Sequence, residues 1–259
     1  MSLMDTIFYS KKRYSLLCLL YNNNELDIDD INNYLNETSV SILPQIKKLI
    51  ECNLIENNSG KYKLTPIGKL ISKKVKQYIK KIELFEKNID FWSNINFSGV
   101  PTFITDNIGN LDSIYILNIN LNSNNESILE KTLKYVNHLT MIINNNYEMY
   151  YNILKYRIKN DLYTKLITTE LIMDILLKKI NKLDLKNVKN LKYNKILSCS
   201  NTFEIIVTSD ILILSFKNTK RDLDTVSFII SCNANSLKLG NEIINYFERK
   251  KEQKMSNNE

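Results

Sequence analysis

The chain has 259 residues, enough to bury one large core or two smaller ones, and its 44% hydrophobic and 24% charged content is that of an ordinary soluble globular protein. The longest apolar run, Ser15–Tyr21, is too short to span a bilayer, and no N-terminal segment has the layout of a signal peptide, so we expect a cytoplasmic protein without membrane contact. The cysteines form no CxxC pair, which argues against a zinc ribbon or a disulfide framework and is typical of a reducing cytoplasm. They are Cys18, Cys52, Cys199 and Cys232.

Positive charge is concentrated in one segment. Residues 40–87 hold 11 lysines and 4 glutamates, so the net charge of this segment equals the +7 of the whole chain. A concentrated basic face is what neutralisation of nucleic-acid phosphates requires. Lysine-rich solvated helices are also common, so charge alone does not decide between the two.

The first predicted elements are two short helices. Lys11–Tyr21 has apolar residues at a helical period and ends at Asn22–Asn24. Asp27 or Asp29 can cap a second helix. Its expected inner face consists of Ile28, Ile31, Tyr34 and Leu35. Residues 36–38 then make a turn.

A third helix is predicted from an apolar stripe formed by Ile42, Ile46, Leu49 and Ile50. With Ser41 as its cap, Pro44 falls at the third helical position, where its missing N–H has no partner to lose. The opposite face offers Ser39, Ser41, Leu43, Lys47 and Lys48. Serines can reach base edges or phosphates, and lysines are natural phosphate contacts. The alternative is a polar face that contacts only solvent.

A hairpin and a long helix follow. Leu54–Ile55 and Tyr62–Leu64 read as strands around an Asn-Asn-Ser-Gly turn, and we expect Lys61, Tyr62 and Lys63 to contact the DNA backbone or minor groove. Thr65 and Pro66 start a fourth helix that runs to about Lys87. Helix, hairpin and helix in this order are the second half of a winged helix-turn-helix, whose recognition helix enters the DNA major groove.

The C-terminal half has a different pattern. Residues 88–112 form an aromatic connector with the only tryptophan, Trp92. Alternating strand-like and helix-like segments then predict an α/β domain with a mixed, mostly parallel sheet. The expected strands are 113–121, 139–143, 163–168, 203–208, 211–216 and 226–231, and the expected helices are 126–137, 147–159, 171–183 and 236–250.

Catalytic motifs are missing from the sequence. His138 is the only histidine, which excludes a two-histidine metal site and the paired His-Lys motif of phospholipase D. The five glycines form neither a phosphate-binding loop nor a GxSxG elbow. Cys199 and Cys232 are candidate nucleophiles or redox sensors, but neither has a visible acidic or basic partner. We therefore expect no enzymatic activity, no metal and no cofactor.

A binding role is the better prediction for this half. Ligands of open α/β sheets lie beyond the carboxyl ends of the strands, and a helix N-terminus with a free hydroxyl suits an anion. The candidate effector-binding residues are Asn118, Asn144, Tyr147, Tyr151, Thr168 and Thr169. Capping and ordinary core packing are the alternative for each of them.

Five segments together resemble a known family. They are ILPQIKKL (42–49), YKLTPIGKLI (62–71), ELFEKNIDFW (83–92), FSGVPTFITDNIGNL (97–111) and LGNEIINYF (239–247). In this order they are similar to archaeal winged-helix transcriptional regulators of the methanogen filamentation and methanogenesis-regulator type. The resemblance implies a homodimer with an ArsR-like DNA-binding head. It also implies a C-terminal sensor domain, with a catalytically silent phospholipase-D-like fold as one possible form.

The sequence therefore predicts a dimeric transcription regulator that binds double-stranded DNA under the control of an unknown small effector. Its expected parts are a winged helix-turn-helix domain (8–87), the connector (88–112), an α/β sensor and dimerisation domain (113–250) and a disordered tail (251–259). The two heads would address half-sites about 10 base pairs apart or a multiple of that. The dimer interface is open between the long helix and the sheet domain. The alternative function is a winged-helix interaction module of a transcription or RNA-processing complex that does not read DNA.

Overall fold

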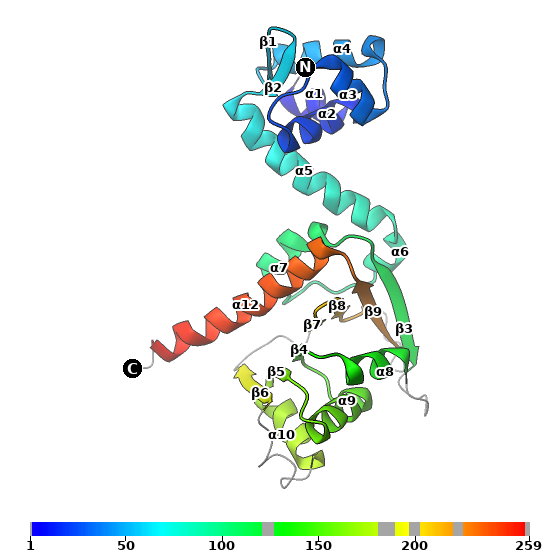
Figure 1. The fold of residues 1–259 in the computed structure, drawn as a ribbon, viewed down its shortest axis with the longest axis vertical. Helices are drawn as coiled ribbons and strands as arrows, with labels where there is room; N and C mark the ends of the chain where they lie inside the picture. The colour runs from blue at the N-terminus through cyan, green and yellow to red at the C-terminus, as the bar shows by residue number, and fades with distance from the viewer. Residues whose placement is uncertain (1, 121–126, 181–189, 197–202, 220–224, 257–259) are drawn as a thin grey trace. The chain divides into compact units, whose positions relative to one another are not determined.

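The computed structural model describes residues 2–120, 127–180, 190–196, 203–219 and 225–256 (Figure 1). The chain divides into two compact units, Met1–Glu83 and Leu84–Glu259. The long helix α5 (Pro66–Glu86) runs past the boundary between them.

The N-terminal unit has the predicted elements in the predicted order, with one addition. Its helices are α1 (Leu3–Phe8), α2 (Lys11–Asn22), α3 (Ile28–Leu35), α4 (Ser39–Glu51) and the first part of α5, and its strands are β1 (Ile55–Asn58) and β2 (Lys61–Leu64). The addition is α1, which begins at a capping box between Ser2 and Asp5. Apart from α1, the three helices α2 to α4, the two-stranded hairpin and the following helix make this unit a winged helix-turn-helix.

The core of this unit lies between α2, α3 and α4 and is closed by the hairpin. Its fully buried side chains include Leu16, Leu17, Ile31, Ile42, Leu49 and Leu54. Tyr34 was predicted on the inner face of α3 but is 64% exposed. Ile31 is fully buried, and Ile28 and Leu35 pack against the same core, so Tyr34 falls outside this stripe of α3.

The prediction for the start of α4 was wrong. Thr38, not Ser41, is the N-cap, so Pro44 lies inside the helix rather than in its first turn. Proline cannot donate to the carbonyl of Val40, so one helical hydrogen bond is lost there. Pro44 is on the exposed side of α4, where water can satisfy that carbonyl.

The wing is a tight hairpin. Ile55 pairs with Leu64 and Asn58 with Lys61, which leaves Ser59 and Gly60 as the two-residue turn. Their φ angles of 53° and 89° are those of a type I′ turn, in which glycine removes the strain of the left-handed region. Tyr62 is only 8% exposed and pairs with Leu26. The expectation that Tyr62 is an exposed contact of the wing is therefore wrong, because its ring is part of the core.

One core position of α2 is occupied by a charged side chain. Arg13 shares the buried stripe of Leu16, Leu17 and Leu20 and is 1% exposed. Within the described residues its Nε and Nη1 atoms have no hydrogen-bond partner, and the guanidinium carbon lies 6.0 Å from the centre of the Tyr9 ring. A buried and unpaired charge opposes folding.

Arg13→Met should therefore raise the free energy of unfolding of the N-terminal unit by about 1–3 kcal/mol, because an apolar side chain of similar length fills the same space. Amide hydrogen exchange in α2 measures the change. Lys11→Met, at an exposed position of the same helix, serves as the control and should leave exchange unchanged. Faster exchange in Arg13→Met would contradict this account of Arg13.

The second unit is built on a seven-stranded sheet in the order β3-β9-β8-β7-β4-β5-β6. The strands are β3 (Tyr115–Asn120), β4 (Leu139–Ile143), β5 (Thr164–Thr169), β6 (Leu191–Ile196), β7 (Phe203–Val207), β8 (Leu212–Phe216) and β9 (Thr225–Ser231). Strand β6 was not predicted. The prediction of a domain that combines helices with a mixed sheet is confirmed.

The prediction that the sheet is mostly parallel was wrong. Only β4–β5 and β5–β6 are parallel, whereas the other four neighbouring pairs of described strands are antiparallel. Strand β3 pairs with β9 at one edge of the sheet, and β4 lies between β5 and β7.

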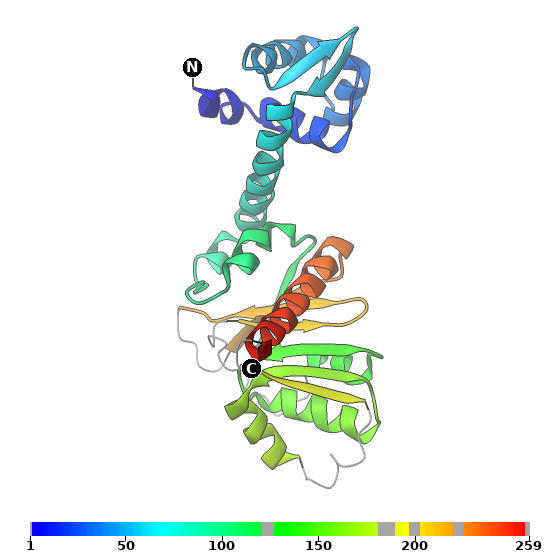
Figure 2. The same ribbon diagram turned by 90° about the vertical axis from the view of Figure 1, so that its left-hand side faces the viewer.

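Each face of the sheet has its own hydrophobic core. On one face lie α8 (Ile128–Tyr135), α9 (Glu148–Lys159) and α10 (Glu170–Lys179). On the other lie α12 (Ala234–Ser256) and the segment that was predicted as a connector (88–112). This segment contains α6 (Ile89–Trp92), α7 (Thr102–Asn107) and the 3₁₀ helix η1 (Ile108–Asn110). Figure 2 shows α12 crossing its face of the sheet.

The aromatic residues of the connector are part of this second core. Trp92 is 4% exposed and contacts Phe85, Phe97 and Phe216. Helix α12 continues to Ser256, so residues 251–256 of the expected disordered tail are helical. Residues 257–259 lie outside the described residues.

A buried arginine holds the α8 side of the sheet together. Arg157 of α9 is fully buried, and its Nη1 donates to the carbonyls of Leu133 and Val136 at 3.1 and 2.6 Å. Its Nη2 donates to the carbonyl of Tyr163 at 2.7 Å, and its Nε to Thr164 Oγ1 at 2.8 Å. The guanidinium thus satisfies carbonyls at the C-terminal end of α8 and joins that end to β5.

Candidate nucleic-acid interface

The exposed face of α4 combines apolar and basic side chains. Val40 and Leu43 are 84% and 44% exposed, and Lys47 and Lys48 are exposed one turn further along the helix. Within the described residues neither lysine forms an ion pair. The buried stripe of α4 packs on α2, so this face points away from the core. Exposed apolar groups suit thymine methyls, and unpaired lysines suit phosphates.

The two serines predicted on this face are already bonded within the protein. Ser39 Oγ accepts a hydrogen bond from Asn32 Nδ2 at 2.6 Å. Ser41 Oγ lies 2.9 Å from Glu37 Oε2 and 2.9 Å from the carbonyl of Thr38. Both serines are half-buried. They are thus less available to DNA than the exposed side chains of α4.

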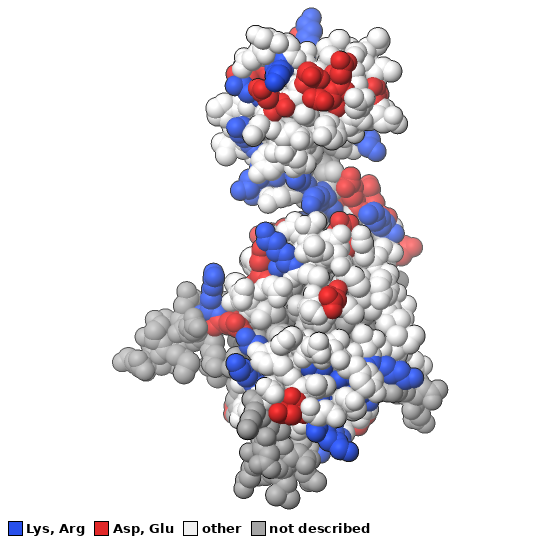
Figure 3. All heavy atoms as spheres, viewed as in Figure 1, with Lys and Arg blue, Asp and Glu red and all other residues white. Residues whose placement is uncertain are grey.

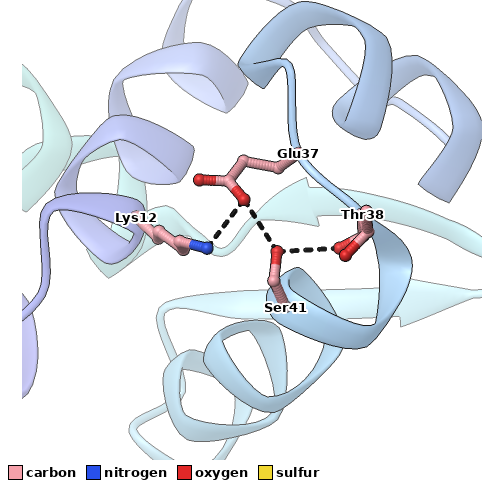
Figure 4. Close-up of polar contacts among 4 residues, drawn as sticks. All are labelled: Lys12, Glu37, Thr38 and Ser41. Carbon is pink, nitrogen blue, oxygen red and sulfur yellow. Dashed lines mark hydrogen bonds and ion pairs between the residues drawn. The ribbon is translucent and has the colours of Figure 1, made fainter.

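Sequence reasoning missed Lys12 and Glu37. Figure 4 shows Glu37, from the turn before α4, between Lys12 of α2 and Ser41 of α4. The Lys12 Nζ atom lies 2.7 Å from Glu37 Oε2, the same oxygen that Ser41 contacts. The hydrogen bond from Lys12, and then that from Ser41, lower the pKa of the Glu37 carboxyl. Sequence spacing gave no signal, because Lys12 and Glu37 are 25 positions apart.

The two wing lysines are paired with acids. Lys61 Nζ lies 3.2 Å from Glu25, and Lys63 Nζ lies 3.2 Å from Glu56 on the opposite strand. These pairs are largely exposed, so each contributes little to stability and can be exchanged for another anion.

Helix α5 carries six lysines and two glutamates. In the view of Figure 3 basic side chains lie along this helix, whereas acidic side chains gather on the visible face of the N-terminal unit. Most lysines of the basic segment found in the sequence thus lie on α4, the wing and α5.

The predicted effector-binding residues are only partly gathered, because Thr168 and Asn144 lie at the adjacent ends of the paired strands β5 and β4 while Asn118 lies on the edge strand β3. Asn118 lies on edge strand β3 and accepts a hydrogen bond from Ser227 at 2.7 Å. Tyr151 donates to the carbonyl of Lys179 at 3.3 Å. Thr168 donates to the carbonyl of Ile143 at 2.7 Å, and Thr169 caps α10 through the N–H of Ile172. Each of these contacts joins elements of the second unit to one another or caps a helix.

Asn144 and Tyr147 do come together, near a buried carboxylate that sequence reasoning missed. Glu204 on β7 is 3% exposed, and its Oε1 accepts 2.9 Å bonds from the N–H groups of Asn144 and Asn145. Its Oε2 accepts a 2.6 Å bond from the hydroxyl of Tyr150, whose ring contacts that of Tyr147. Burial raises the pKa of Glu204 in spite of these bonds, and burial likewise raises the pKa of Tyr147.

The raised pKa of Glu204 predicts a pH dependence of stability. The folded state holds the proton more tightly than the unfolded state, so the contribution of this group declines as pH rises from the ordinary value of 4.5 to the folded pKa. Glu204→Gln should abolish that decline. Urea unfolding followed by Trp92 fluorescence at several pH values measures it, because the only tryptophan lies in this unit.

Asp174→Asn, at an exposed carboxylate of the same unit, is the matched control and should keep the wild-type pH profile. Identical pH profiles for Glu204→Gln and the wild type would show that Glu204 does not titrate in this way.

Of the two cysteines considered as reactive groups, Cys232 is exposed and free. Cys199 lies outside the described residues. No α-helix within the described part of the chain has the length and apolar character needed to cross a bilayer.

The N-terminal unit is thus a winged helix domain whose α4 presents an exposed apolar and basic face. Residues 3–83 match the family model described as "Methanogenesis regulatory protein FilR1, N-terminal domain". The resemblance predicted from the sequence is confirmed over these residues.

One curated relative is the Methanogenesis regulatory protein FilR1 of Methanothrix harundinacea (strain 6Ac). It is 30% identical over 86 residues, which are 33% of this chain and 19% of that protein. The match therefore spans about a fifth of the relative's length.

Two solved structures have low similarity to the chain. One is TrmBL2, described as an archaeal chromatin protein with a novel mode of DNA binding, at 9% identity and a TM-score of 0.40 over 95% of this chain and 96% of that one. The other is Nuc, a phospholipase D family member from Salmonella typhimurium, at 10% identity and a TM-score of 0.34 over 53% of this chain and 92% of that one. Likeness at these scores supports neither a shared fold nor a shared function.

Proposed function

We propose that the protein is a DNA-binding transcription regulator in which α4 enters the major groove and the wing contacts the backbone. The observation that carries the proposal is the exposed, unpaired pair Lys47 and Lys48 on α4 of a unit that matches a regulator's N-terminal domain. Leu43 lies one turn before these lysines, where it would meet base edges while they contact phosphates.

The test is selection from a pool of fragmented genomic DNA with the full-length protein at about 50 and 200 mM salt, followed by sequencing of the retained fragments. A regulator enriches a defined site, and its affinity falls by about 10³-fold or more over this range if it contacts several phosphates. Weak retention without sequence preference would contradict the proposal.

We further propose that the protein acts as a dimer and that the second unit controls DNA binding in response to an effector. In support of a second copy, α5 carries apolar side chains that are 46–71% exposed, namely Ile67, Leu70, Tyr78 and Ile82. Light scattering of the full chain tests the dimer. A palindromic arrangement of the selected sites would agree with it.

The alternative function is a winged-helix interaction module that binds a protein partner instead of DNA. One observation favours it, the exposure of Val40 and Leu43 on α4. An apolar helix face can dock in a partner's groove. Leu43→Lys distinguishes the two functions, because it adds a cation next to DNA but disrupts an apolar protein contact. Retained or stronger binding of DNA of random sequence by this variant, even where the selected site loses its advantage, favours DNA as the partner.

A further inference from the structure

The turn before α4 places a carboxylate where two groups could otherwise bind a phosphate. Glu37 Oε2 is 2.7 Å from Lys12 Nζ and 2.9 Å from Ser41 Oγ. An ammonium and a hydroxyl that converge on one anionic oxygen form the same arrangement that proteins use for a phosphate oxygen. Ser41 lies in the first turn of α4, so this oxygen is held beside the end of the proposed recognition helix.

This carboxylate can be displaced. The side chains of Lys12 and Glu37 are 36% and 29% exposed, so the pair is accessible to solvent and to a ligand of this face. An ion pair that solvent reaches to this extent is weak, so a DNA phosphate can displace the carboxylate.

We propose that Glu37 is an internal competitor of DNA, which occupies Lys12 and Ser41 in the free protein and gives way to a backbone phosphate when α4 enters the groove. This proposal rests on the proposed DNA-binding function and adds Lys12 as a phosphate contact. It gives the free protein a reduced affinity for polyanions that offer no well-placed phosphate, since only a correctly positioned phosphate displaces the carboxylate.

The test is titration of the selected DNA site with Glu37→Gln over a range of salt concentrations. Releasing Lys12 should raise the affinity by up to about 5-fold, the equivalent of an exposed ion pair. It should also steepen the slope of log K against log salt, by no more than the roughly 0.9 of one phosphate contact, because the variant has no competing ion pair that salt can weaken. Glu37→Ala should behave in the same way, which guards against an effect of the glutamine amide.

Two controls separate release of Lys12 from a general gain of positive charge. Asp174→Asn makes the same change in net charge at an exposed position of α10, outside the unit proposed to bind DNA, and should leave the salt slope unchanged. In a Lys12→Met background, Glu37→Gln should no longer increase affinity. A gain that persists without Lys12, or a loss of affinity in Glu37→Gln, would overturn the proposal.

The Lys47→Ala/Lys48→Ala variant in the same titration keeps the two claims apart. If it weakens binding while Glu37→Gln changes nothing, the competitor proposal fails and the DNA-binding function stands. If the wild type binds no site specifically and the double variant changes nothing, the proposed function itself fails.

Discussion

The Lys47→Ala/Lys48→Ala variant should bind the selected DNA site about 60-fold more weakly than the wild type at about 0.1 M salt. Each lost phosphate contact reduces the slope of log K against log salt by about 0.9, so the slope should become shallower by about 1.8. Fluorescence anisotropy of a labelled duplex at several salt concentrations gives both values. We expect this loss of affinity because both side chains are exposed on α4 and form no ion pair among the described residues.

Lys131→Ala/Lys159→Ala removes the same charge from exposed positions of α8 and α9 in the second unit. This control should change the affinity by no more than about 2-fold, because both lysines lie outside the unit that is proposed to bind DNA. If the control and the α4 variant lose equal affinity, the binding depends on net charge and α4 has no special role.

Arg157→Met should destabilise the second unit by about 3–5 kcal/mol. Its guanidinium donates to five carbonyls, those of Leu133, Lys134, Val136, Asn137 and Tyr163, and to the hydroxyl of Thr164. Methionine leaves several of these oxygens buried without a donor, and each such group costs about 1–3 kcal/mol unless water reaches it. Urea unfolding followed by Trp92 fluorescence measures the loss.

Arg157→Lys is the informative companion variant. Burial lowers the pKa of Arg157 to about 10, so the arginine is charged near neutral pH. A lysine ammonium has three donors and cannot reproduce the planar fork, so we expect an intermediate loss of about 1.5–3 kcal/mol. A loss below about 1 kcal/mol in Arg157→Met would mean that relaxation or water replaces these bonds.

The elements of the winged domain could be predicted because their signals are local. A helical stripe, a turn with Ser59 and Gly60, and the Thr65–Pro66 start each depend on a few adjacent residues. The sheet order could not be predicted in this way. Strand β3 pairs with β9, more than 100 positions away, and no local pattern indicates that partner.

Charged residues account for most of what the sequence failed to reveal. Arg13, Arg157 and Glu204 are all buried, although charged side chains are usually found at the surface. Their partners lie on other elements, and Arg13 lacks partners for two of its donors among the described residues. The sequence can therefore count these charges but cannot assign them to the core.

At the candidate interface the sequence predicted helix α4 correctly, but it did not show which side chains are exposed and which are buried or hydrogen-bonded within the protein. The structure leaves Leu43, Lys47, Lys48 and Lys61 exposed, whereas it buries the ring of Tyr62 and engages both serines in local bonds. Their bonding partners are Asn32 of α3 and Glu37 of the turn before α4. Their side-chain directions depend on how α3 packs against α4.

Methylation interference on the selected DNA site tests the central claim most directly. Methylation of guanine N7 blocks the major groove, whereas methylation of adenine N3 blocks the minor groove. If α4 lies in the major groove, N7 methylation should abolish binding at a short run of guanines in each half-site. Leu43→Ala should weaken binding to the unmodified site and lose sensitivity at one position of that run. Interference confined to adenine N3, or none at either position, would contradict major-groove binding by α4.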